Sequence, residues 1–91
     1  MKRYVIEREI PGVQNLVAGE LKEAAATSNA ALAKFPGRIT WEHSYVVKDK
    51  TFCVYLADSP ETVLEHAKAS GFPANKITEV RTVIEPLTAN G

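Results

Sequence analysis

The sequence predicts an α+β fold whose elements follow the order β-α-β-β-α-β. Three observations predict it. Four short segments are rich in β-branched and aromatic residues, two longer segments carry apolar residues at helical spacing, and a Pro-Gly pair or a glycine ends each helical segment. The chain has 91 residues, which suits one domain over 1–91 with a loosely ordered tail from about residue 86.

The first strand and the first helix fill the N-terminal part of the chain. Tyr4-Val5-Ile6 is a β-branched and aromatic run, closed by charges and then by Pro11-Gly12. A stripe of apolar or small residues three and four apart then predicts a helix from Val17 to Phe35, with Asn15 as the nearest capping candidate. Pro36-Gly37 ends this helix. The stripe consists of Val17, Leu21, Ala24, Ser28, Ala31 and Phe35, flanked by Ala25 and Leu32.

A hairpin and a second helix follow. Ile39 to Val47 and Thr51 to Ala57 are the predicted strands of the hairpin, joined by a short polar turn. The second helix has the clearest signals. Ser59 is a good N-cap, Pro60 suits the first helical position, Glu61 suits the positive end of the helix dipole and Gly71 is a stop. Its apolar stripe is Val63, Leu64 and Ala67.

The last predicted strand, Ile77 to Ile84, alternates apolar and charged residues. The resulting order is that of a ferredoxin-like sandwich, a four-stranded antiparallel sheet with two helices on one face. In this fold the first and third strands are central, and here both are apolar on both faces. Because two helices cover only one face, we expect a second copy of the chain to cover the open face.

Composition excludes several classes of partner and site. Eleven basic and 11 acidic residues give zero net charge, which argues against a general nucleic-acid or membrane-surface binder. The single cysteine, Cys53, allows no internal disulfide and no paired-cysteine metal motif. No segment has the length and apolarity of a signal peptide or a membrane span, so the expected location is the cytoplasm.

The open face of the sheet is the expected place for a ligand. If Tyr4, Ile6, Phe52, Val54 and Leu56 face the helices, strand alternation directs a mixed polar set to the open face. That set is Val5, Glu7, Cys53, Tyr55, Glu79, Arg81 and Val83. Buried charges need partners, so two readings stay open: a pocket, or an Arg81–Glu7 or Arg81–Glu79 pair at a wet dimer interface.

The direction of His43 depends on the hairpin turn. A two-residue turn at Asp49-Lys50 pairs Tyr45 with Val54 and places His43 and Tyr45 on the helix side. A three-residue turn at Lys48-Asp49-Lys50 pairs Tyr45 with Cys53 and places both on the open face. In the second case an imidazole meets carboxylates, a donor set that suits nickel, copper or zinc.

The remaining candidates have plain structural alternatives. His66 is expected at the border of the second helix's apolar stripe. There it is either an exposed histidine or a metal ligand that reaches the open face of a partner subunit. Cys53 is either a small packing residue or a nucleophile that needs His43 as its base. Trp41 is a core residue, an interface anchor or the lid of a pocket.

Several short motifs together resemble a family of small bacterial proteins, mainly of unknown function, one branch of which binds nickel. The segments are Tyr4–Arg8, His43–Val46, Phe52–Tyr55, Glu65–Ala67, Gly71–Asn75 and Ile77–Val80. This resemblance spans Met1 to about Pro86 and implies a ferredoxin-like fold, a homodimer and nickel binding. The residues carried over in matching motifs are Glu7, His43, Tyr45, Cys53, Tyr55, His66 and Glu79.

The expected function is a homodimer that binds a small ligand or a divalent metal such as nickel, with no organic cofactor. The metal ligands are drawn from His43, His66, Glu7 and Glu79, and the other ligand contacts from Glu7, Tyr45, Cys53, Tyr55 and Arg81. Two alternatives remain. One is a cofactor-free enzyme that acts on a small organic molecule in an open-face cavity, with Tyr55, His43 and Arg81 as its reactive groups. The other is a purely structural dimer.

Overall fold

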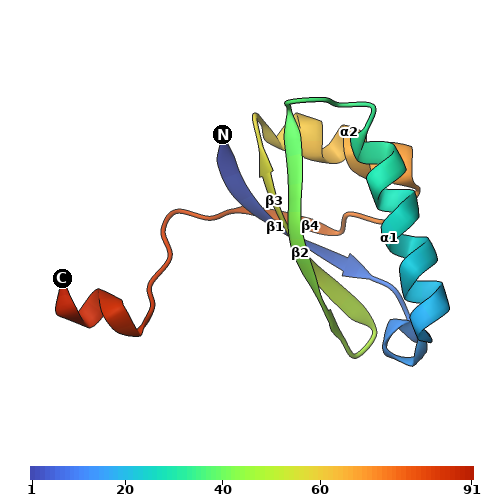
Figure 1. Ribbon diagram of the computed structural model, residues 1–91, viewed down its shortest axis with the longest axis horizontal. Coiled ribbons are helices and arrows are strands. Elements are labelled where there is room, and N and C mark those ends of the chain that lie inside the picture. Colours follow the sequence, from blue (N-terminus) through green and yellow to red (C-terminus); the bar gives the residue numbers. More distant parts are fainter.

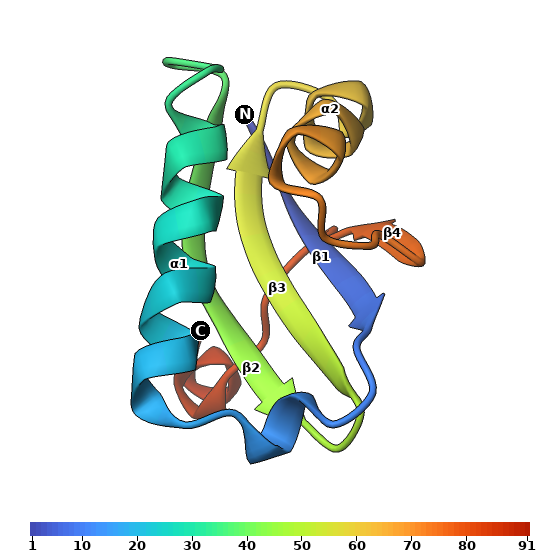
Figure 2. The ribbon, with the colours of Figure 1, turned by 90° about the vertical axis from the view of Figure 1, so that its right-hand side faces the viewer.

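The computed structural model describes all residues, 1–91, as a four-stranded antiparallel sheet with two helices on one face (Figures 1 and 2). The strand order is β2-β3-β1-β4, so the first and third strands are central, as predicted. No helix has the length and apolarity needed to span a membrane. The strands are β1 (Lys2–Glu9), β2 (Ile39–Val47), β3 (Lys50–Ala57) and β4 (Lys76–Glu79). The helices are η1 (Val13–Asn15), α1 (Ala18–Leu32), α2 (Pro60–Ser70) and η2 (Pro86–Asn90), of which η1 and η2 are 3-10 helices.

Helix α2 begins and ends where its sequence signals predict. The backbone N–H of Thr62 donates to the Ser59 hydroxyl, Pro60 is the first helical residue, and Gly71 closes the helix in the left-handed region at φ 79°. The buried stripe, however, is Thr62, Val63, His66 and Ala67, whereas Leu64 is 46% exposed. The buried face of α2 is therefore centred beside the predicted apolar stripe. His66 consequently lies within the buried face and not at its border.

Helix α1 is shorter than predicted and only its second half is well packed. It begins after Val17, whose N–H donates to the Glu20 carboxylate at 3.1 Å, so Asn15 is not the cap and lies in η1. Of the predicted stripe, Ser28 and Ala31 are buried, but Val17 and Leu21 are 64% and 41% exposed. The N-terminal half of α1 therefore lies over the sheet without packing tightly against it.

Strand β4 is half the predicted length, because its partner ends. Tyr4 pairs with Glu79, and the Val80 N–H donates to the Arg3 carbonyl at 2.8 Å. Since β1 begins at Lys2, almost no strand remains for residues 81–84 to pair with. The alternation of these residues was therefore misleading. Residues 80–91 instead form an arm that extends away from the helices, on the open side of the sheet (Figure 1), and η2 lies within the segment expected to be loosely ordered.

The facing of β3 is the reverse of the predicted one. Tyr4 pairs with Tyr55 and Ile6 with Cys53, and residues opposite each other in an antiparallel pair share a face. Cys53 and Tyr55 therefore belong to the core under the helices. The prediction that Phe52, Val54 and Leu56 face the helices is wrong for all three. The core cluster is Tyr4, Ile6, Ile39, Cys53, Tyr55, Ala57 and Val63.

Neither predicted hairpin turn is present. Val47 pairs with Lys50, so the turn is Lys48-Asp49, and Tyr45 pairs with Phe52. Asp49 adopts φ 58°, which a short hairpin turn requires and which Asp tolerates better than most residues. His43 and Tyr45 consequently lie on the open face, the outcome expected from the three-residue turn but reached through a different register.

A β-bulge between Trp41 and His43 changes the facing of strand β2. Trp41 pairs with Tyr55 whereas His43 pairs with Val54, so Glu42 is the extra residue. Before the bulge Trp41 faces the helix side, and after it His43 faces the open side. The Trp41 indole N–H donates to the Ser44 hydroxyl at 2.9 Å and spans the bulge on the helix side.

Candidate functional site

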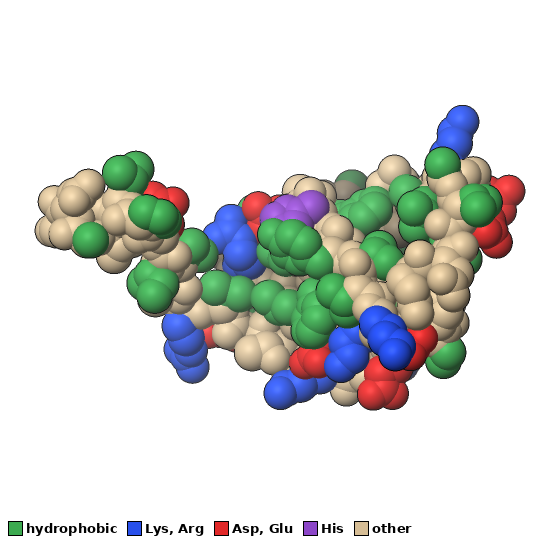
Figure 3. Space-filling view, turned by 90° about the horizontal axis from the view of Figure 1, so that it is seen from below, with side chains coloured by type: hydrophobic (Ala, Val, Ile, Leu, Met, Phe, Trp, Pro, Cys, Tyr) green, Lys and Arg blue, Asp and Glu red, His purple; other side chains and the backbone are tan.

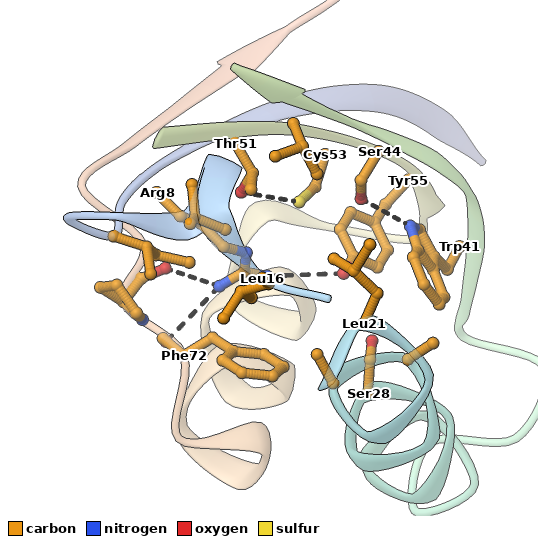
Figure 4. A pocket seen from close by; sticks show the side chains of 16 residues that line it. Arg8, Leu16, Leu21, Ser28, Trp41, Ser44, Thr51, Cys53, Tyr55 and Phe72 are labelled. Atoms are coloured by element: carbon orange, nitrogen blue, oxygen red, sulfur yellow. Dashed lines mark hydrogen bonds between the residues drawn. The ribbon is translucent and has the colours of Figure 1, made fainter. Parts of the chain in front are cut away.

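The chemistry-bearing residues divide between the two faces of the sheet. A cavity of about 320 Å³ lies on the helix side (Figure 4), and its lining comes from five regions: β1, η1 with its flanking loop, α1, the β2-β3 hairpin and the loop after α2. Most of the lining is apolar. The polar lining residues are Arg8, Ser28, Ser44 and Thr51, with the thiol of Cys53 and the phenol of Tyr55. The expected cavity was on the opposite face.

Arg8 is the central charged group of this cavity. It is only 2% exposed, because the alternation Tyr4, Ile6, Arg8 places it on the helix face of β1. Its Nη1 donates to the carbonyls of Phe72 and Pro73, at 3.4 and 2.6 Å, and its Nη2 donates to the Tyr55 hydroxyl at 3.5 Å. A guanidinium remains charged in proteins, yet Arg8 makes none of the six ion pairs of the chain.

The surroundings of Tyr55 and His66 favour the neutral form of each side chain. Burial raises the pKa of Tyr55, and the charge of Arg8 opposes that rise. Burial also lowers the pKa of His66, whose ring lies 5.3 Å from that of Tyr55. One ring nitrogen of His66, Nε2, lies 3.3 Å from the Ser28 carbonyl, whereas Nδ1 has no partner. His66 is 0% exposed, so it packs α2 against α1 and does not reach the open face.

Cys53 and Thr51 lie side by side on the helix face of β3. The thiol is buried and contacts the Thr51 hydroxyl at 3.4 Å. His43, the only base considered for this thiol, faces the other side of the sheet. Cys53 is therefore a wall of the cavity, and His43 does not activate its thiol within this chain.

On the open face His43 is the exposed histidine of the chain. Its ring meets the Tyr45 ring edge-on, with centroids 5.0 Å apart, and Figure 3 shows a surface histidine beside a run of hydrophobic side chains. The bulge also directs Glu42 to this face, where Arg3 Nε donates to its carboxylate at 2.6 Å. The hydrogen bond from Arg3 holds the pKa of Glu42 below its usual range, and the His43 charge acts in the same direction.

The remaining predicted site residues lie elsewhere. Glu7 shares the open face and forms a 3.8 Å ion pair with Lys50. Glu79 is opposite Tyr4 at the end of β4 and pairs with Lys2 and with Arg81, each at 3.4 Å. Arg81 lies beyond the strand, with its side chain 88% exposed. The Arg81–Glu79 pair, considered above as part of a wet dimer interface, thus exists, but at the sheet edge.

The structure therefore separates the proposed ligands into three groups. Glu7, His43 and Tyr45 share the open face, Cys53, Tyr55 and His66 lie on the helix side, and Glu79 and Arg81 lie at the edge. Within one chain no group of three or more His, Cys, Asp or Glu side chains lies close enough to hold a metal ion. Sequence reasoning missed Arg8 as a site residue, although its spacing from Ile6 pointed to the helix face.

Comparison with known proteins places the chain in a family. A search of the curated proteins gives no match. Among solved structures, SCO4226 from Streptomyces coelicolor A3(2) is similar, with a TM-score of 0.74 and 18% sequence identity over 90% of this chain and 99% of that chain. At this identity the likeness supports the fold. The family model described as "Nickel responsive protein SCO4226-like" matches residues 4–80. This match covers most of the chain, which therefore belongs to the SCO4226-like family of small bacterial proteins with nickel-responsive members.

Proposed function

We propose that this protein is a ferredoxin-like homodimer that binds nickel, or a similar divalent metal ion, at a site shared by the open faces of two sheets. The observation that carries the proposal is the composition of that face. It combines the exposed imidazole of His43 with exposed apolar side chains, including Tyr45 at 58% and Val47 at 38%. The strand order supports the ferredoxin-like assignment.

The donor set suits nickel but is incomplete in one chain. His43 offers an imidazole, and Glu42 and Glu7 offer carboxylates on the same face, ligand types that bind nickel. A two-fold axis through the open face doubles each donor, which turns a partial set into a complete one. The family's nickel-responsive members favour this metal over other divalent ions.

The C-terminal arm supports the homodimer. Its exposed fractions are 61% for Val83, 80% for Ile84 and 69% for Leu87, and it extends on the open side of the sheet (Figure 1). Exposed apolar groups in this number are expected to be covered by another surface. A second copy is the partner we propose, since its open face is itself partly apolar.

Nickel titration by calorimetry, combined with analytical ultracentrifugation, tests the proposal. We expect saturable binding near neutral pH, a dimer, and weaker nickel binding in His43→Ala. Thr40→Ala is the matched control, because Thr40 is exposed on the same face of the same strand but offers no imidazole. Replacement of Ile84 by Lys is expected to weaken the dimer.

Three results would count against the proposal. Absence of nickel binding with both histidines intact would reject metal binding. A monomer at all concentrations would reject a site shared by two chains. Nickel binding that His43→Ala and Thr40→Ala reduce equally would place the metal elsewhere.

A further inference from the structure

We propose that the helix-side cavity is a second, separate binding site, which takes a small aromatic monocarboxylate with its carboxylate against Arg8. This site lies on the opposite face of the sheet from His43 and does not depend on a metal. Three features carry the inference: a buried cation without an ion-pair partner, a buried hydroxyl without a hydrogen-bond partner, and an enclosure lined mostly by apolar side chains (Figure 4).

Arg8 differs from every other arginine of the chain. Arg3 pairs with Glu42, Arg38 with Asp58 and Arg81 with Glu79, and all three have side chains at least 39% exposed. Arg8 is 2% exposed and has no carboxylate within 4.0 Å. A buried cation is costly unless it is paired, so an anionic ligand bound at this point would be stabilised by Arg8.

The hydrogen-bond donors around Arg8 are also incompletely used. A guanidinium has five N–H groups, and the chain provides partners for three of them. The Ser28 hydroxyl is 4% exposed, lines the cavity and has no hydrogen-bond partner, although it is near enough to Tyr55 to influence its pKa. Tyr55 accepts from Arg8, which leaves its own proton free to donate. An anion is the ligand that satisfies all of these donors.

The rest of the cavity selects the body of the ligand. Trp41 and Phe72 contribute aromatic walls, and Leu16, Leu21 and Val13 contribute aliphatic ones. A volume of about 320 Å³ is at the small end of ligand pockets. A second charge, as in a dicarboxylate or a phosphate monoester, would meet these apolar walls without a partner. One carboxylate on a single aromatic ring fits both the charge and the walls.

Arg8 has a structural role as well, because it holds the loop after α2 through the Phe72 and Pro73 carbonyls. That role explains the Nη1 contacts alone. It does not explain why the buried group is charged, or why Ser28 is left without a partner. The test must therefore separate charge recognition from loop anchoring.

The chain carries its own reporter for this test. Trp41 is the single tryptophan and lines the cavity, so its fluorescence reports binding directly. The metal-free protein, held in EDTA, is titrated with phenylacetate and with phenylacetamide, which share a body and differ in charge. Hydrogen bonds to charged groups exceed neutral ones, so we expect phenylacetate to bind at least about tenfold more tightly.

Variants then assign the preference to residues. Arg8→Gln is expected to reduce phenylacetate affinity to that of the amide, and Ser28→Ala to weaken phenylacetate several-fold with little change in folding. Arg81→Gln, a surface arginine outside the cavity, is the matched control and keeps the wild-type affinity. His43→Ala is expected to bind phenylacetate normally, which separates this site from the metal.

Equal affinity for acid and amide, or no saturable change in Trp41 fluorescence with phenylacetate, would overturn the proposal. If Arg8→Gln does not fold, the acid-to-amide ratio of the wild-type protein and the effect of Ser28→Ala still decide it. Equal losses of phenylacetate affinity in Arg81→Gln and Arg8→Gln would mean that only the net charge of the protein matters. That result would also overturn the proposal.

Discussion

The two faces of the sheet are built from the same central strands but leave different kinds of side chain without partners. On the helix side the apolar groups are covered, whereas Arg8 lacks an ion-pair partner and the Ser28 hydroxyl lacks a hydrogen-bond partner. On the open side the charged groups are paired within the chain, as in Arg3–Glu42 and Lys50–Glu7, while apolar groups remain exposed. The comparison teaches that the two faces suit different partners: a small anion would pair with Arg8 on the helix side, and a second protein surface would cover the apolar groups of the open side.

The largest expected difference between the faces is in stability. Ile6 is 0% exposed on the helix side, so Ile6→Ala is expected to lower the free energy of unfolding by about 2–5 kcal/mol. Val5→Ala, its neighbour on the open face, removes less buried surface from the monomer and is expected to lower it less. Urea denaturation at several protein concentrations measures both. Equal losses at the lowest concentration would mean that the two faces are equally covered.

Glycine substitutions probe the helix layer itself. Gly71 has φ 79° and supports the loop whose carbonyls accept from Arg8, so Gly71→Ala is expected to destabilise by about 1–2 kcal/mol through backbone strain. Gly19→Ala in α1 has open space for a methyl group and is expected to stabilise by about 0.5–1 kcal/mol. Thermal unfolding measures both signs. A stabilising Gly71→Ala would contradict the strained geometry after α2.

The two histidines provide a pH test of the comparison. Burial lowers the pKa of His66 below its ordinary value of 6.5, so the unfolded chain takes up a proton that the folded chain resists. This contribution to stability is complete above about pH 6.5 and is lost as the pH falls below it, with a slope of at most about 1.4 kcal/mol per pH unit. Denaturation between pH 7.5 and 5.5 is expected to lose this slope in His66→Gln and retain it in His43→Gln. The reverse result would mean that His66 is solvated.

The smallest expected effect concerns the open-face ion pair. Arg3 and Glu42 lie at the surface, and exposed pairs contribute little to stability. Arg3→Gln is therefore expected to leave the unfolding midpoint nearly unchanged, and any change is expected to vanish in high salt. A large loss in Arg3→Gln that persists in high salt would show that this pair is shielded by a partner, which would sharpen the case for a covered open face.

The sequence specified the elements better than their facing. Local signals, such as the Ser59 cap and the Gly71 stop, depend on neighbouring residues and were correct, as were the bounds of β2. The register between β1 and β3 depends on residues about 50 positions apart, Tyr4 with Tyr55, and both strands are apolar on both faces. Alternation therefore offered no reason to prefer one facing, and the candidate site was assembled on the wrong side of β3.

The sequence did not predict the burial of Arg8, for a different reason. An arginine in a strand is ordinarily read as an exposed residue, and its burial depends on carbonyls that come from the loop after α2. The open-face group of Glu7, His43 and Tyr45 was partly predictable. The bulge at Glu42 was not, because a single extra residue leaves no periodic signal in so short a strand.

That bulge has a consequence for how such a protein can change over evolutionary time. In a regular strand Trp41 and His43, two positions apart, would face the same side, and Glu42 is what separates them. Deletion of Glu42 would leave Trp41 and His43 adjacent in a regular strand, where they would still face opposite sides of the sheet. Insertion or deletion of one codon here is therefore a change by which relatives would gain or lose a carboxylate beside the exposed histidine while the cavity stays intact.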